Sequence, residues 1–424
     1  MGKKNRRNKN AATSGDDMSE VSSMMSFSTA ASDRSESDHV EYIDDDSKFK
    51  MMIDEIGNKN SKTSVPALKF IFTKMQQMPM TSLLASQKLT LSTELYRALR
   101  KSKSDFRLML LKCIAVLFLS LDEEDANEIF EDVQRELIAS LKDKVKDAAL
   151  ALGIVTSTCF NPDLVCASFA AYRDIIKRAY LKGDDLPPVL KGTDAVFVTS
   201  CLESWSYLIA ATSHYGGFRR LIEKEIDELS PELPGLLRSA SVDVRLAASE
   251  AAALATEIAR EFRGDEFDFD NVDDMLECLD DLAQGTAVGG GSVKSLKKND
   301  RKNQKMTVRN TRDLILDRVP ADVKTVQISI QEQLELDNYC DITRYEGICW
   351  CLEGGINMHL TYNELLRNAD WFELGSIVPR VTKLDKLDAI DKLHRQVVRG
   401  QIDKNRNNAR KKERQNRADD HYYD

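Results

Sequence analysis

The residues best suited to chemistry are the cations near the C-terminal end of the chain. The segment "RQVVRGQIDKNRNNARKKERQNR", residues 395–417, contains nine Lys or Arg residues and two acids, Asp403 and Glu413. Lys and Arg at this density bind phosphate groups, and the interspersed Asn and Gln can bond phosphates, sugars and base edges. No aromatic residue lies among them, which argues against stacking of single-stranded bases. The composition is therefore typical of an arginine-rich helix that binds RNA.

Two other interpretations of this segment stay open. A run of like charges is often a solvated terminus, and "RKKER" at 410–414 also matches a short nuclear import signal. Upstream, apolar residues recur every three or four positions from Val381 to Ile402, which predicts one apolar helix face. We expect an amphipathic-to-basic helix over 381–417, whose first half packs on protein and whose second half needs a polyanion, and then a tail over 418–424.

A second group of cations follows three glycines, Gly289 to Gly291, in a segment predicted to be a flexible linker over 284–305. The linker cations that form a secondary basic site are Lys294, Lys297, Lys298, Arg301, Lys302 and Lys305. The glycines follow no predicted strand and lack the Gly-x-Gly-x-x-Gly spacing, so a nucleotide site is not expected.

The sequence offers no catalytic or metal-binding pattern. None of the five histidines belongs to a nucleophile, P-loop or HExxH motif, and His359 is typical of a packed or capping histidine. The pair Cys349 and Cys351 lacks further ligands at metal-site spacing. We therefore expect no enzyme activity, cofactor, metal or small-molecule substrate. The eight cysteines lie largely in apolar runs, which is typical of reduced thiols in an intracellular protein.

Composition places the chain among soluble proteins with long exposed helices. It has 424 residues, a net charge of −9 and 42% hydrophobic residues, which is enough for a large core. The most apolar stretch, Leu108–Leu121, is too short for a membrane span and contains Lys112, so no membrane partner is expected. Residues 1–46 are basic, then serine-rich, and are predicted to be a disordered tail.

Helical periodicity dominates residues 47–283, and three segments there resemble one another. These segments cover residues 101–117, 139–155 and 238–255. Each has a polar turn, an Asp, an apolar residue beside a cation and an Ala/Leu-rich helix, and the cations are Arg107, Lys146 and Arg245. The first two cations are 39 residues apart, which is one helical-repeat period. The pattern predicts a HEAT/armadillo-like α-solenoid, in which Trp205 belongs to the core.

Two further features lie around the linker. Residues 261–281 hold ten acids and one Arg, which indicates a solvated face or, alternatively, a docking strip for a basic peptide. Residues 306–380 predict a small, mostly helical C-terminal domain with a short helix at "DLILDRVP", a strand at "KTVQISIQ" and two longer helices. In the last helix, Thr361 and Glu364 have the spacing of a capping box.

The chain resembles the interferon-related developmental regulators over nearly its whole length. The matching features are the serine-rich basic start, the helical repeats, "HLTYNELLR" at 359–367 shortly before "ELGSIVPR", and the basic end at 393–417. The resemblance implies a mainly α regulator without catalysis. It also implies a factor of translationally inactive ribosomes, whose basic C-terminal helix lies in the rRNA-lined path of mRNA and tRNA.

By position, the resemblance assigns RNA contacts to ten residues of the C-terminal segment. They are His394, Arg395, Arg399, Lys404, Arg406, Arg410, Lys411, Lys412, Arg414 and Arg417. The implied partners are rRNA and ribosomal proteins in the cytoplasm. The family is also described as co-regulators that recruit histone deacetylase complexes, so the alternative is a nuclear co-regulator whose repeats scaffold corepressor proteins.

Overall fold

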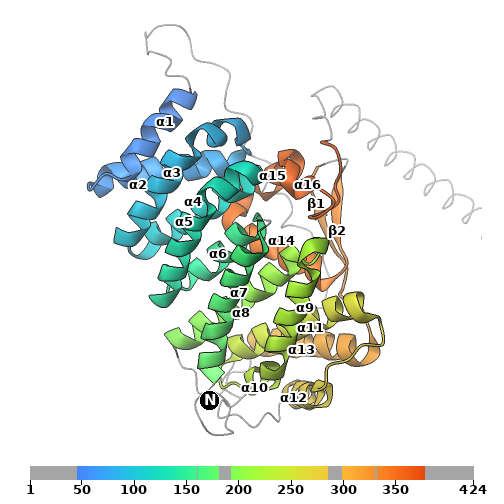
Figure 1. Cartoon of the computed structure of the whole chain (residues 1–424). Helices are drawn as coiled ribbons and strands as arrows, with labels where there is room; N and C mark the ends of the chain where they lie inside the picture. The colour runs from blue at the N-terminus through green and yellow to red at the C-terminus, as the bar shows by residue number, and fades with distance from the viewer. Residues whose placement is uncertain (1–44, 160, 181–191, 285–297, 330–331, 378–424) are drawn as a thin grey trace, which may run out of the picture. The chain divides into compact units, whose positions relative to one another are not determined.

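The computed structural model describes residues 45–159, 161–180, 192–284, 298–329 and 332–377 (Figure 1). The predicted N-terminal tail, most of the predicted linker and the predicted helix over 381–417 lie outside these residues. The described part is mainly helical, as the sequence predicted.

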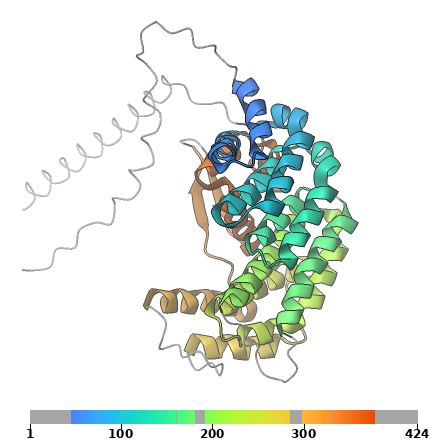
Figure 2. The same cartoon turned by 90° about the vertical axis from the view of Figure 1, so that its left-hand side faces the viewer.

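Most helices stack in two rows in which successive members contact each other, with α9 and α10 joined through the 3₁₀ turn Ser230–Glu232. The outer row consists of α1 (Asp45–Ile56), α3 (Thr81–Lys101), α5 (Glu123–Lys142), α7 (Pro162–Tyr180), α9 (Arg219–Leu229), α10 (Leu233–Leu237) and α12 (Val272–Gln284). The inner row consists of α2 (Ser61–Gln77), α4 (Ser104–Ser120), α6 (Asp147–Ser157), α8 (Thr193–Thr212), α11 (Val242–Arg263) and α13 (Lys298–Asp317). The rows curve as a solenoid (Figure 2), which confirms the predicted fold class.

The inner helices are apolar on nearly every side because they are covered on nearly every side. In α6 all residues from Ala151 to Ser157 are buried, and in α8 Trp205 is fully buried, as predicted. Among the described helices, α8 is long and apolar enough to cross a membrane, but 83% of the tested window is buried within the protein. Its apolar character is therefore accounted for by packing.

Two of the three predicted repeat cations have the same role. Arg107 donates to the carbonyl of Ser102, with Nε at 2.9 Å, just after α3 ends. Arg245 donates to the carbonyls of Ser239 and Ala240 at 2.7 and 3.1 Å, just after α10 ends. Each guanidinium satisfies carbonyls that a helix end leaves without a partner. Lys146 is instead exposed to solvent, so segment 139–155 repeats the helix but not this contact.

The C-terminal elements are a hairpin and three short helices. Strands β1 (Lys324–Gln327) and β2 (Gln333–Leu336) pair antiparallel, with Val326 opposite Leu334. They are followed by α14 (Tyr339–Leu352), α15 (Ile356–Tyr362) and α16 (Glu364–Arg367). All of them contribute to the same buried cluster as the repeats.

Two details differ from the sequence predictions. Helix α13 begins at Lys298, inside the range predicted as linker, because its buried Val308, Leu314 and Ile315 pack with the repeats. The capping box is wrong because Thr361 lies within α15 and donates to the carbonyl of Asn357 at 2.6 Å. Asn363 caps α16 instead.

Helix α14 crosses the concave face of the solenoid and contacts α4, α6, α8 and α11. The closest approach is to Tyr207 of α8, where a Cβ atom added to Gly347 would overlap the Tyr207 ring. A helix can come this near to a buried aromatic ring only where it carries no side chain. Gly347 is therefore the residue that lets α14 fill the groove (Figure 2).

We expect Gly347→Ala to lower the free energy of unfolding by about 1–3 kcal/mol, the usual cost of overpacking a core. The control is Gly354→Ala, because no atom lies within 4 Å of an added Cβ there. Urea denaturation measures both changes. Equal stability of the two variants would contradict the close approach of α14 and α8.

Candidate functional site

Of the predicted RNA-binding residues, the structure describes only four cations of the predicted linker. All ten residues assigned between His394 and Arg417 lie outside the described residues, as do Lys294 and Lys297. Lys298 and Arg301 lie in the first turn of α13, where Lys302 is exposed and Lys305 half-buried. The described candidate site is therefore the group of side chains that fixes the chain just before the basic C-terminal segment begins.

Three residues of "HLTYNELLR" form this group, and we call His359, Asn363 and Arg367 the anchor. They are spaced four residues apart and all three are buried. His359 bonds the carbonyl of Met75, near the end of α2, through Nε2 at 2.8 Å. Asn363 donates to the carbonyl of Leu119, near the end of α4, at 2.6 Å. The anchor thus attaches α15 and α16 to the ends of two inner helices (Figure 1).

Arg367 holds the last described turn of the chain. Its guanidinium donates to the carbonyls of Leu374, Gly375 and Ser376 at 2.9–3.1 Å, and it pairs with Glu332 at 2.6 Å. The Arg367 side chain is 2% exposed. Gly375 has a φ of +68°, which glycine adopts without strain. The position of residues 374–376, the last turn before the described chain ends, is therefore set by one buried guanidinium.

The hydrogen bonds of His359 fix its protonation state. Asn363 Nδ2 lies 3.3 Å from His359 Nδ1, and an amide nitrogen can only donate. Nδ1 must then accept, and Nε2 carries the proton that is donated to Met75. Burial lowers the pKa of His359 below its usual 6.5, although the bond to Met75 opposes the shift. His359 is therefore a packed, neutral histidine, as the sequence predicted.

Helix α14 is held at both ends. Glu257 of α11 accepts the backbone N–H groups of Tyr339 and Cys340 at 3.0 Å, which places a carboxylate at the positive end of the α14 dipole. At the other end, Gln76 donates to the carbonyl of Cys351 at 3.0 Å, and Lys112 pairs with Glu353 at 2.6 Å. These contacts bring the chain from the hairpin across the concave face to the anchor.

The predicted acidic strip over 261–281 has a buried apolar side and a largely exposed acidic side. Phe269, Met275 and Leu279 are buried, and several of its acids form ion pairs. These pairs are Arg318–Glu266, Arg260–Asp268, Arg238–Asp274 and Arg312–Asp280. The arrangement favours the solvated face of a terminal repeat over a peptide-docking strip.

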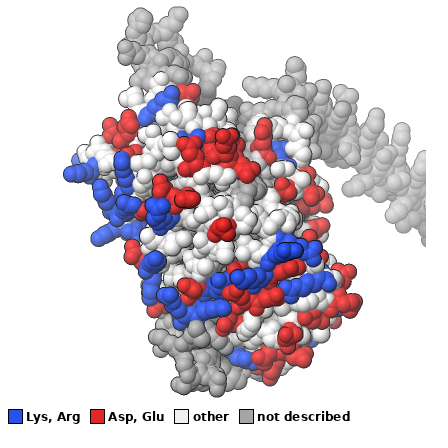
Figure 3. Space-filling view, viewed as in Figure 1, with Lys and Arg blue, Asp and Glu red and all other residues white. Residues whose placement is uncertain are grey.

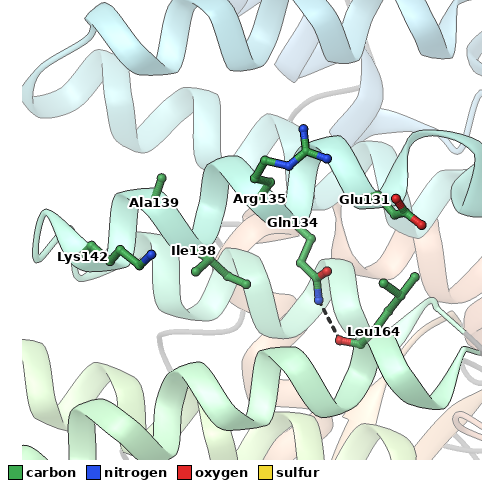
Figure 4. Close-up of a pocket in the computed structure, with 7 residues that line it drawn as sticks. All are labelled: Glu131, Gln134, Arg135, Ile138, Ala139, Lys142 and Leu164. Carbon is green, nitrogen blue, oxygen red and sulfur yellow. Dashed lines mark hydrogen bonds between the residues drawn. The ribbon is translucent and has the colours of Figure 1, made fainter.

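A groove of about 460 Å³ lies between α5 and α7 on the outer face (Figure 4). Gln134 crosses it and donates to the carbonyl of Leu164 at 2.7 Å and to the hydroxyl of Ser168 at 2.9 Å. Its polar group is thus already paired, and the groove is a seam between two packed helices.

One histidine lies close to a cysteine in the described part of the chain, with His214 Nε2 at 3.4 Å from Cys340 Sγ. Burial raises the pKa of Cys340 to about 12 and lowers that of His214 to about 4. Both shifts favour neutral groups, whereas a nucleophilic cysteine needs a thiolate beside an imidazolium. The pair therefore lacks the electrostatics of a catalytic dyad.

Residues 17–315 match the sequence pattern of the family described as Interferon-related developmental regulator (IFRD), which is more than half of the 424 residues. The chain belongs to the interferon-related developmental regulator family. Mouse interferon-related developmental regulator 1 is 26% identical over 388 residues, covering 88% of this chain and 81% of that protein. The human protein of that name is 26% identical over 387 residues, with the same coverage of both chains. Mouse interferon-related developmental regulator 2 is 26% identical over 383 residues, covering 88% and 82%.

These relatives are named as developmental regulators and not as enzymes. The family resemblance seen in the sequence is thereby confirmed. Sequence reasoning singled out "HLTYNELLR" as a family motif, but it did not assign roles to Asn363 and Arg367. The signal that could have shown their role is the recurrence of a polar His, Asn and Arg at every fourth residue, although in the structure the helix breaks at Asn363, which caps α16.

We expect Arg367→Ala to lower the free energy of unfolding by about 3–5 kcal/mol, because Glu332 would keep a buried charge without its partner. The control is Arg97→Ala, which removes an ion pair with Glu94 whose Arg side chain is 61% exposed and should cost less than about 1 kcal/mol. Urea denaturation gives both values. Limited trypsin digestion should release the C-terminal segment faster from Arg367→Ala alone. Equal release from both variants would argue that Arg367 does not hold this part of the chain.

The neutral state of His359 predicts acid sensitivity. Because its pKa is lowered in the folded state, its contribution is complete above pH 6.5 and is lost as the pH falls below that value. The loss is at most about 1.4 kcal/mol per pH unit. His359→Gln should flatten the decline in unfolding free energy between pH 7 and 5.

The comparison is made in a His214→Gln background, because the lowered pKa of His214 acts in the same direction. Identical pH profiles with and without His359 would show that the imidazole is not held neutral.

Proposed function

We propose that this family member is a non-enzymatic ribosome-binding regulator that keeps ribosomes translationally inactive in the cytoplasm. In this proposal the basic helix over 381–417 occupies the rRNA-lined path of mRNA and tRNA. Its partners are rRNA and ribosomal proteins. Occlusion needs no catalysis, because a helix that neutralises phosphates in this path excludes the RNAs that would otherwise enter it.

The observation that carries the proposal is a buried anchor that is followed in sequence by a basic segment, in a chain that is otherwise acidic. The anchor holds the chain at residue 376 through buried contacts. Beyond Ile402 the sequence has no large apolar residue up to Arg417, although the whole chain has a net charge of −9. A segment of this kind cannot bury a core of its own. Its cations are therefore available for a polyanion, and in sequence they follow a part of the chain that is fixed by packing.

The filled concave face weighs against the alternative, a nuclear scaffold for histone deacetylase corepressors. Solenoids commonly bind partners on their concave surface, but here α14 covers α4, α6, α8 and α11. The acidic strip is also engaged in internal ion pairs. A corepressor would have to use the remaining acids, so neutralising Asp265, Asp270 and Asp273, all exposed, is the test of that function.

We expect deletion of residues 394–424 to abolish co-sedimentation with purified ribosomes, because it removes all ten assigned RNA contacts. The control is deletion of 418–424, which contains no Lys or Arg. For the intact chain, about eight phosphate contacts would give log affinity a slope of roughly −6 against log salt. Full pelleting of the 394–424 deletion with idle ribosomes would refute the occlusion mechanism.

A further inference from the structure

The outer helices α1, α3 and α5 run parallel to one another, so their C-terminal ends lie along one edge of the solenoid. Contacts between successive turns confirm this order: Arg100, at the end of α3, pairs with Glu136 of α5. Lys144, just after α5, pairs with Asp194 at the start of α8 at 2.7 Å. Turns that are about 40 residues apart in sequence are therefore neighbours in space.

Helix dipoles favour cations at C-terminal ends and acids at N-terminal ends. Because the C-terminal ends of these helices lie along one edge, the cations that follow them lie along that edge too. Helix α3 ends with Arg100 and Lys101, and α5 ends with Lys142. Helix α5 begins, at the opposite edge, with acids at 123–125. The turn segments 57–62, 100–107 and 142–147 together hold nine Lys or Arg and three Asp. One edge of the solenoid is therefore basic.

We call the exposed lysines of these three turns that form no ion pair the basic rim. They are Lys59, Lys62, Lys101, Lys103, Lys142 and Lys146. Within the described residues none of them has a carboxylate partner in an ion pair, unlike Arg100 and Lys144. Figure 3 shows Lys and Arg gathered down the left-hand edge of the molecule, over the ends of α2, α3 and α5. Free ammonium groups in a row are sites for an extended anion.

The rim is hollowed between its first two turns. A cavity of about 630 Å³ lies between the α1–α2 turn and the α3–α4 turn. Lys59, Lys101, Lys103 and Arg97 line it, with the carboxylate of Glu94 on Arg97 as its counter-charge. A phosphate group in this hollow would be approached by cations from two repeats.

The surface chemistry separates two kinds of anionic partner. Protein interfaces are built around large apolar and aromatic anchors with charge at the margin. No aromatic ring occurs among the exposed large hydrophobic side chains of the described residues, and the rim consists of lysines. Lysine binds phosphate as a point charge, and contacts to phosphate carry no sequence information.

We propose that the basic rim is a second RNA-binding surface, which contacts the phosphodiester backbone without sequence preference. The proposal rests on the proposed function only in taking ribosomal RNA as the source of that backbone. The anchor contacts the far ends of α2 and α4. It is thus separated from the rim by the length of α4, 17 residues, or about 25 Å. The rim and the anchor are therefore separate parts of the surface.

The test uses the full chain and a fluorescein-labelled 20-nucleotide poly(U) RNA. The rim variant is Lys101→Glu, Lys103→Glu and Lys146→Glu together. The control variant is Lys50→Glu, Lys69→Glu and Arg220→Glu, which changes the net charge equally at exposed cations away from the rim. Fluorescence anisotropy over a salt series should show roughly tenfold or greater loss of affinity, and a salt slope shallower by about 2, for the rim variant alone.

Lysine acetylation read by mass spectrometry locates the contact directly. Bound RNA should protect Lys101, Lys103 and Lys146 of the full chain and leave Lys50 and Lys69 reactive. Equal losses of affinity in the rim and control variants, or absence of protection at the rim, would overturn the proposal. Normal RNA binding by the rim variant with lost ribosome pelleting would also overturn it, because the rim would then face an acidic protein surface.

The outcome is independent of the C-terminal deletion. If the 394–424 deletion pellets normally while the rim variant loses RNA binding, the occlusion mechanism fails and the rim stands. If the deletion abolishes pelleting while the rim variant behaves as the intact chain, the rim fails and the occlusion mechanism stands.

Discussion

The docking of α14 on the concave face is the constraint on which the rest of the structure depends. Helices α4, α6 and α8 are apolar on the side that faces this groove, and α14 is the element that covers it. The contact with α8 is possible because Gly347 has no side chain to meet Tyr207. Once α14 lies there, α15 and α16 arrive at the ends of α2 and α4. The position of the anchor, and of the chain up to residue 376, therefore follows from how one helix packs.

A filled groove changes which surfaces remain for partners. In a solenoid with an open concave face, binding and folding compete for the same apolar surface. Here folding has used that surface, and the edges of the stack remain. At one edge α3 and α5 end with cations, and at the other edge α5 begins with acids, as helix dipoles favour. The anchor lies at the edge where α5 begins, opposite the basic rim.

Sequence reasoning reached the parts of this arrangement that depend on local pattern. Apolar spacing predicted the helical repeats, the burial of Trp205 and the packed role of His359. It could not place α14, because periodicity shows that a helix has an apolar face and not what that face contacts. The capping box failed because the Thr361 hydroxyl bonds within its own helix, a competition that spacing does not reveal. The sequence did not reveal the rim, because Lys62, Lys101 and Lys142 are about one repeat apart in sequence and only the stacking of the repeats brings them together.

The charges around the anchor bear on how the two proposed RNA-binding surfaces would act together. The anchor lies at the ends of α2 and α4, and α5 begins shortly after α4 with Glu123, Glu124 and Asp125. Exposed ion pairs with these acids would be worth less than about 1 kcal/mol each, whereas RNA binding gains from release of the counterions condensed on phosphates. On the proposed function, a polyanion would therefore outcompete these carboxylates for the cations of residues 395–417. If both proposals hold, RNA bound at the rim raises the effective concentration of RNA for the C-terminal cations, and the reverse.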